Sequence, residues 1–270
     1  MENQISVKKE KLNGIVFARA LCAIGIIVFH FFCHSNGTVK ILTDTANCCW
    51  GSLFVTVFFV ISGCVLSYNY ISGYSLKKYY YKRLKGIYPI YYIVWFLFYV
   101  EISIVQKNFM WTKPVYLYKT LIGFDAYSQP SFGCVGEWFL AVIITMYLFF
   151  PLMNYLINKK YCKWIVPVVI LLLNLIRVKC NIRNEFNSMS VSTISFYFGM
   201  IVARHRKFFF NNWILGIVSL VLFIVLCCVK VSFVYNYSFE YILYVIQGIL
   251  LFIVLVLELP MKIVENIFPS

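Results

Sequence analysis

Charged residues are scarce in this chain, and acidic residues are the scarcest of them. Of its 270 residues, 13% are charged and 62% are hydrophobic, with 10 Asp and Glu against 24 Lys and Arg. A water-soluble domain has about 25% charged and about 45–50% apolar residues. The shortage excludes a surface that faces water on all sides. It predicts an all-α fold, a polytopic transmembrane helical bundle.

Metal-ligand patterns are missing as well. The ten Cys include no CxxC pair and the three His show no zinc-ligand pattern, so we expect no metal site. Four cysteines lie inside apolar runs, which favours buried thiols packed as small hydrophobic groups: Cys22, Cys64, Cys227 and Cys228. Four others fall near the predicted outer side, where disulfide pairing is the alternative: Cys33, Cys48, Cys49 and Cys134.

Nucleic acid is excluded as a partner despite the net charge of +14, because the basic residues form short clusters between apolar stretches. More of them fall on the cytoplasmic side if the N-terminus lies there, which favours that orientation. The sequence shows no cleavable leader, and no internal repeat of the kind found in transporters.

Eight apolar stretches predict about eight spanning helices. Residues 1–13 form a cytoplasmic tail, 14–258 the transmembrane region and 259–270 a short C-terminal tail. The predicted spans are 14–33, 50–70, 87–105, 137–157, 164–176, 189–203, 213–229 and 239–257. A strongly basic loop, residues 77–85, is expected between the second and third spans.

The first span carries an arginine and a histidine. Arg19 and His30 are eleven residues apart, which on a helix is about 20° more than three full turns and about 16 Å along the axis. Both side chains therefore leave one face. An arginine inside a span costs about 3 kcal/mol on insertion scales, and such residues usually face a polar site. We expect this helix to form one wall of a wet crevice.

Four further motifs follow this pair in order: FFVISG (58–63), KRLKGIYPIYY (82–92), WFLAVIITMYLFFP (138–151) and FYFGMIVAR (196–204). Together with Arg19 and His30 they resemble the membrane-bound acyltransferase 3 family, the O-acyltransferases of bacterial surface glycans. Three departures stand out. Gly86 replaces a second arginine of the family's pattern, Ile143 stands where many members have glutamate, and the chain is expected to lack the family's last spans.

The resemblance implies transfer of an acyl group, expected to be acetyl, from acyl-CoA (acetyl-CoA) to a hydroxyl of a cell-envelope carbohydrate or lipid-linked glycan. It places the chain in the bacterial inner membrane, in contact with lipid. His30 would be the catalytic base and Arg19 would hold a phosphate or carbonyl of the donor. Alternatively, His30 is an interfacial side chain and Arg19 a structural partner of another span.

The resemblance also implies binding residues. Lys82, Arg83 and Lys85 would attract the anionic coenzyme A, whereas a plain positive-inside segment is the alternative for Lys77 and Lys78. On the acceptor side we expect Trp138, Glu137 and Ser62, with Asp125 as a further partner. Ser62 and Gly63 also favour close helix packing.

Helical geometry ranks two aromatic residues of the fourth motif. Trp138 and Tyr147 are nine residues apart and half a turn out of phase, so both cannot face one cavity, and Trp138 is ranked first. Two alternatives to an active acyltransferase remain. One is a transporter whose solute path is lined by Arg19 and His30, and the other is an inactive fragment of the family.

Overall fold

The computed structural model describes residues 2–34, 43–70, 74–105, 121–124, 137–159, 163–179, 185–230 and 240–256. These residues are helical apart from turns, short connections and one isolated β-bridge between Asp44 and Cys49. The chain divides into two compact units. Unit 1 comprises residues 1–69 and 161–270, and unit 2 comprises residues 70–160.

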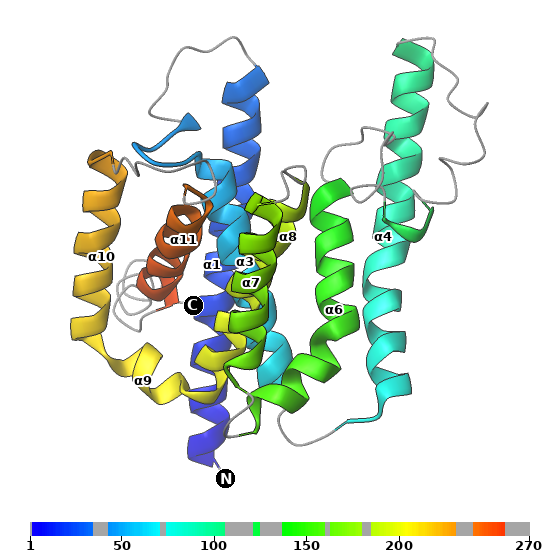
Figure 1. Ribbon diagram of the computed structural model, residues 1–270. Helices are drawn as coiled ribbons and strands as arrows, with labels where there is room; N and C mark the ends of the chain where they lie inside the picture. The colour runs from blue at the N-terminus through cyan, green and yellow to red at the C-terminus, as the bar shows by residue number, and fades with distance from the viewer. Residues whose placement is uncertain are drawn as a thin grey trace. The chain divides into compact units, whose positions relative to one another are not determined.

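Unit 1 is arranged around α3 (Trp50–Asn69), which contacts α1, α8 and α11. Its other helices are α1 (Glu2–His34), α7 (Ile165–Lys179), α8 (Glu185–Arg204), α9 (Arg206–Asn211), α10 (Trp213–Cys228) and α11 (Glu240–Val256). Figure 1 shows α10 beside α11, and α7 packs on α8. The α3 side chains Leu53, Val57 and Ile61 are fully buried, which makes this helix the core of unit 1.

Two glycines bring the backbones of α3 and α8 together. A Cβ added at Gly63 would overlap the backbone oxygen of Phe196, and one added at Gly199 would overlap the backbone oxygen of Val60. Small residues allow helices in membranes to approach this closely. The predicted close packing at Gly63 is therefore confirmed, and it joins two motifs that lie far apart in the sequence.

Unit 2 contains α4 (Leu76–Val105) and α6 (Glu137–Ile157), which contact one another. The prediction of a basic loop at residues 77–85 is wrong, since α4 is helical from Leu76. Lysine, leucine and arginine are good helix formers, and no glycine or proline interrupts the segment before Gly86. At about 1.5 Å per residue, the 30 residues of α4 extend about 45 Å, longer than a bilayer's hydrocarbon core.

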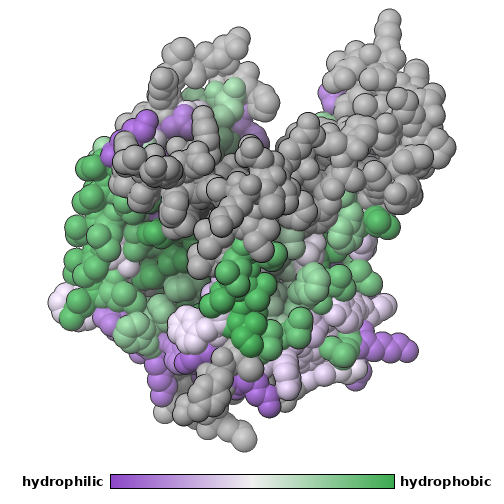
Figure 2. All heavy atoms as spheres, in the orientation of Figure 1, coloured by the Kyte–Doolittle hydropathy of each residue, from purple (hydrophilic) through white to green (hydrophobic). Residues whose placement is uncertain are grey.

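Three helical stretches are long and apolar enough to cross a membrane in the described part of the chain: Gly14–Cys33, Trp50–Asn69 and Trp138–Ile157. Two shorter apolar stretches are Trp213–Cys228 and Leu243–Val256. Figure 2 shows a largely apolar surface over α10, where Trp213, Ile217 and Val221 are exposed. The all-helical membrane fold is confirmed, while the count of eight spans stays a prediction.

The predicted ends of most spans agree with the observed helices. The stretches predicted from Trp50, Glu137 and Trp213 start helices at those residues. At the N-terminus the structure differs, because α1 begins at Glu2 and includes the expected tail. The expected C-terminal tail lies outside the described residues.

Candidate functional site

Arg19 and His30 lie on one uninterrupted helix, α1, so the predicted spacing between them applies without a break. The helix packs against α3 and α11, and its buried residues include Ile15, Ala18 and Cys22. Both Arg19 and His30 are exposed, and at about 100° per residue they fall together on one side of that buried stripe. The crevice expected beside them stays a prediction.

Ser62 lies on α3, half-buried, next to Gly63 at the close approach to α8. At the end of the same seam, Arg204 donates hydrogen bonds to the Ser67 hydroxyl and, at 3.1 Å, to the backbone oxygen of Met200. These contacts account for the arginine at the end of the FYFGMIVAR motif. Arg204 therefore links α8 to α3 through its hydrogen bond to Ser67.

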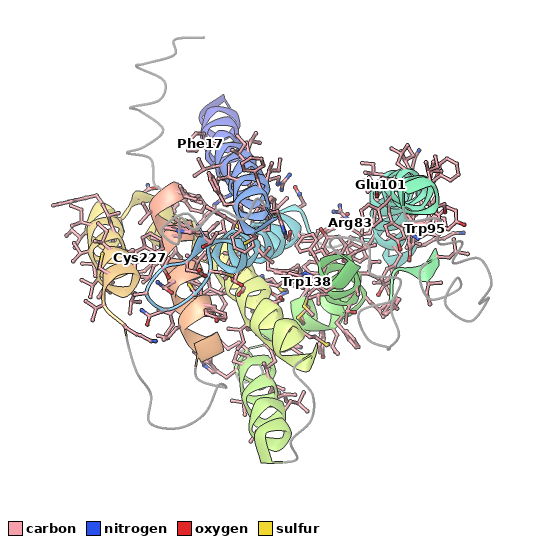
Figure 3. All side chains as sticks on the ribbon, turned by 90° about the horizontal axis from the view of Figure 1, so that it is seen from above. Phe17, Arg83, Trp95, Glu101, Trp138 and Cys227 are labelled. Carbon is pink, nitrogen blue, oxygen red and sulfur yellow. The ribbon has the colours of Figure 1, made fainter. Side chains whose placement is uncertain are left out.

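Arg83 of unit 2 lies among three tyrosine rings. Its guanidinium carbon is 5.9 Å from the ring centre of Tyr70, 6.0 Å from that of Tyr79 and 5.7 Å from that of Tyr147. We call these three residues the tyrosine cluster. Figure 3 shows Arg83 between α4 and α6. Aromatic faces attract a guanidinium and hold its plane without using its hydrogen-bond donors.

A proline explains why α6 presents a hydrogen-bond acceptor to this cluster. Pro151 lies inside α6 and has no N–H for the backbone oxygen of Tyr147, four residues earlier. The Tyr79 hydroxyl donates to that oxygen at 2.8 Å, and the Tyr80 hydroxyl donates to the next one, on Leu148, at 3.0 Å. Two phenols of α4 thus fix its register against α6.

The floor of the cluster is apolar. Tyr79 and Phe150 are both fully buried and stack with ring centres 5.4 Å apart, and Tyr70 packs edge-on against Tyr79. Burial raises the pKa of the Tyr79 phenol well above its usual value, and the nearby Arg83 charge opposes this only in part. Tyr79 therefore remains a neutral hydrogen-bond donor.

Within the part of the chain that the structure describes, the guanidinium of Arg83 uses few of its hydrogen-bond donors. Among the described residues its one hydrogen bond is a long one, 3.5 Å to the Tyr70 hydroxyl, and its buried Nε has no acceptor. An arginine carries five N–H donors, and a buried donor without an acceptor is costly. This contrasts with Arg204, which is hydrogen-bonded within unit 1. Arg83 is equipped to bind an anion.

Other cations lie close to Arg83 in sequence on the first turns of α4. Lys82 and Lys85 are exposed, as are Lys77 and Lys78, and the Lys85 ammonium lies 6.0 Å from the Tyr81 ring centre. An arginine held by aromatic rings with exposed lysines beside it can bind a ligand that carries several phosphates. These positive charges all belong to one helix.

The two ranked aromatic residues of α6 have different surroundings, and their ranking for the cavity stays a prediction. Tyr147, ranked second, belongs to the tyrosine cluster, whereas Trp138 is 41% exposed and packs edge-on against Phe139. Glu137 begins α6, and its side chain lies outside the description, as does all of Asp125. Their expected roles stay predictions.

The sequence did not identify Tyr70 and Tyr79 as site residues, because many tyrosines lie close together in this part of the chain, a pattern typical of a membrane interface. The sequence signal for Tyr79 is Pro151, which frees a carbonyl oxygen inside an apolar helix and so predicts a donor from a neighbouring helix. In the part of the chain that the structure describes, no group of three or more His, Cys, Asp or Glu side chains is arranged to hold a metal ion.

Comparison with protein families relates the chain to a known domain family. A family model described as an acyltransferase domain matches residues 12–267, nearly the whole chain. No curated protein and no solved structure matches significantly.

Proposed function

Because this chain belongs to the acyltransferase domain family and has apolar helices long enough to cross a membrane, we propose that it is an integral-membrane O-acyltransferase. The proposed donor is acyl-CoA, with acetyl-CoA the simplest case. The proposed acceptor is a hydroxyl of a cell-envelope carbohydrate or of a lipid-linked glycan. The membrane would be the bacterial inner membrane, with the N-terminus in the cytoplasm.

The observation that carries this proposal is the state of Arg83. Its guanidinium is held by three rings, makes one long hydrogen bond and has a buried Nε without an acceptor in the described residues. Phosphate oxygens are good acceptors for a guanidinium, because two parallel N–H groups match their geometry. Arg83 therefore binds a phosphate group of coenzyme A in this proposal.

The lysines near Arg83 supply the remaining charge. Lys82 and Lys85 are exposed on the same helix, so their ammonium groups can approach further phosphates without leaving water. An ammonium acts as a point charge and is less demanding in geometry than a guanidinium. Arg83 fixes the position of the donor, and the lysines raise its local concentration.

His30 is the proposed base. A neutral imidazole takes the proton of the acceptor hydroxyl as that oxygen attacks the thioester carbonyl of the donor. The new C–O ester bond forms, the C–S bond breaks, and the proton passes from the imidazolium to the departing thiolate. Arg19, about 16 Å from His30 along the axis of α1, would lie nearer the cytoplasm in the proposed orientation, and there it would hold an oxygen of the donor.

On the acceptor side the proposed binding residues are Trp138, Glu137 and Ser62. The exposed indole of Trp138 offers an apolar face on which a sugar ring can pack, and the carboxylate and hydroxyl would accept hydrogen bonds from sugar hydroxyls.

The test is the ester content of envelope glycans in cells that express the chain. We expect ester formation with the parent chain and none with His30→Ala, since alanine cannot accept the proton. The matched control is His205→Ala, which removes an exposed histidine elsewhere in unit 1. Ester formation that survives His30→Ala removes the proposed base. Proton-coupled solute uptake without any need for coenzyme A would place the chain among transporters instead.

A further inference from the structure

The fold of unit 1 brings two adjacent pairs of cysteines together. Cys48 and Cys49 precede α3, whereas Cys227 and Cys228 end α10. The Ala46 N–H donates to the backbone oxygen of Cys227 at 2.9 Å, which pins the first pair's segment to the end of α10. The side-chain amide of Asn47 strengthens this join by donating to the backbone oxygen of Val229 at 2.9 Å. Figure 3 shows Cys227 on α10.

One side-chain amide contacts a thiol from each pair. The Cys48 thiol donates to Gln247 Oε1 at 2.8 Å, and Gln247 Nε2 donates to the Cys227 sulfur at 3.8 Å. Gln247 lies on α11 and is fully buried. The two sulfurs are therefore separated by no more than the width of one amide group and its two hydrogen bonds.

Burying a polar side chain in an apolar helix costs free energy unless the side chain is hydrogen-bonded. Here the only side-chain partners of the Gln247 amide within the described residues are these two sulfurs. Cys22 and Cys64, by contrast, lie in the apolar core of unit 1 and pack as small hydrophobic groups. The pair at Gln247 is chemically different from the other buried thiols.

We propose that Cys48 and Cys227 form a redox-active dithiol, which an external disulfide-bearing oxidant converts into an intrachain disulfide. The class of reactant is a thiol–disulfide exchange partner, either a protein oxidoreductase or a small disulfide. Because the span Gly14–Cys33 separates residue 13 from this junction, the junction lies on the oxidising side if the N-terminus is cytoplasmic. Only this location on the oxidising side rests on the orientation given under the proposed function.

The disulfide forms by two successive thiol–disulfide exchanges. Cys227, which is half-buried beside the exposed Cys228, loses its proton to water and its thiolate attacks the external disulfide. One external sulfur leaves as a thiolate, and a mixed disulfide remains on Cys227. Cys48 then loses its proton and attacks the Cys227 sulfur, and the second external thiolate leaves. The two cysteines give up two electrons, and the external disulfide takes them.

The order of attack follows from the surroundings of the two thiols. Cys48 is 6% exposed, and burial raises the pKa of its thiol to about 12, so it is a poor first nucleophile. Its attack is the second, intramolecular step, for which the Gln247 amide has to move from between the two sulfurs. When the disulfide forms, Cys48 loses its thiol hydrogen and can no longer donate a hydrogen bond to Gln247 Oε1. The new S–S bond also links the segment that precedes α3 covalently to α10.

The test uses the full chain, purified in detergent under reducing conditions. The reductant is removed, oxidised glutathione is added, remaining thiols are alkylated, and the digest is analysed by mass spectrometry. We expect two peptides linked through Cys48 and Cys227 that separate on reduction. Neither residue should carry the alkyl label, because only free thiols react with it. This readout does not depend on acyl transfer or on membrane orientation.

Matched variants identify the residues. Cys49→Ser and Cys228→Ser should keep the link, whereas Cys48→Ser should leave glutathione on Cys227 and Cys227→Ser should leave Cys48 reduced. Complete alkylation of both Cys48 and Cys227 in the oxidised parent chain would overturn the proposal. A link between Cys49 and Cys228 in their place would overturn it as well.

Discussion

The hydroxyl of Tyr79 donates a 2.8 Å hydrogen bond to the backbone oxygen of Tyr147, the oxygen that Pro151 leaves without its helical donor. This bond joins α4 to α6 between two residues whose rings both lie near the guanidinium of Arg83, with ring centres 6.0 Å and 5.7 Å from its carbon. The Tyr79 hydroxyl of α4 thus replaces the backbone N–H donor that Pro151 lacks in α6. The position of the proposed donor-binding arginine follows from that pairing.

Replacing Tyr79 with phenylalanine should lower the free energy of unfolding by about 1–3 kcal/mol, because a buried acceptor loses its donor while the ring is kept. Thermal unfolding of the purified protein in detergent measures the change. Tyr81→Phe is the control, since Tyr81 is 64% exposed and should change stability little. Equal losses in the two variants would contradict the role given to the Tyr79 hydroxyl.

The same phenol should make stability depend on pH at the alkaline end. In the unfolded chain Tyr79 ionises near its ordinary pKa of about 10. In the folded chain burial raises the pKa, so the proton is retained. Above a pH of about 10 the unfolded state alone releases this proton, and the free energy of unfolding falls as pH rises.

Comparison of the parent chain with Tyr79→Phe isolates this contribution from that of the other ionisable groups. Their difference in unfolding free energy should be constant near neutral pH and should shrink above a pH of about 10. A difference that stays constant through the alkaline range would show that Tyr79 titrates normally in the folded protein.

Gly199→Ala should destabilise unit 1 by about 1–3 kcal/mol, since its Cβ would overlap the backbone oxygen of Val60 and the two helices must separate. Gly63→Ala should act alike from the other side of the seam. Gly86→Ala is the matched control: a Cβ there meets nothing within 4 Å, and alanine should add about 0.5–1 kcal/mol of helix stability. A neutral Gly199→Ala would refute the close approach of α3 and α8.

Arg83→Gln should raise the KM for acyl-CoA by roughly 10–150-fold, the equivalent of about 1.5–3 kcal/mol lost from hydrogen bonds to a charged group. The kcat should change less, because Arg83 is assigned to binding and not to proton transfer. Arg206→Gln is the control, since Arg206 also lies over a tyrosine ring, 5.2 Å from that of Tyr68. Equal effects on KM would remove Arg83 from the donor site.

The sequence was sufficient to locate most helices. Apolar runs that begin at Trp50, Glu137 and Trp213 start helices there, because a span must satisfy its backbone hydrogen bonds internally. The helical form of residues 77–85 differs from the sequence prediction, since a cluster of positive charge between apolar stretches predicts a loop. A cluster of charged residues shows that a segment is exposed to water, but it does not show whether its backbone is helical or irregular.

The candidate site was predicted in part. The motifs single out Arg83 and Tyr147, but the contact between them and the part played by Tyr70 and Tyr79 do not follow from sequence, because hydropathy does not define the register of α4 against α6. The junction at Gln247 was likewise hidden. Cys227 and Cys228 fall in an apolar run, and Cys48 and Cys49 fall near the predicted outer side, so nothing in the sequence relates the two pairs. Only the fold brings the start of α3, the end of α10 and the middle of α11 together, where Cys48 and Cys227 contact one amide.

The most direct test of the central claim, that Arg83 and its tyrosine cluster hold an acyl-CoA donor, is thermal stabilisation of the purified chain by acetyl-CoA. We expect the melting temperature to rise with acetyl-CoA concentration, since a ligand that binds only the folded state adds to its stability. Free acetate should have no effect, and Arg83→Gln should need far more ligand for the same rise. An unchanged melting temperature at saturating acetyl-CoA, or an equal response of Arg83→Gln, would contradict the account.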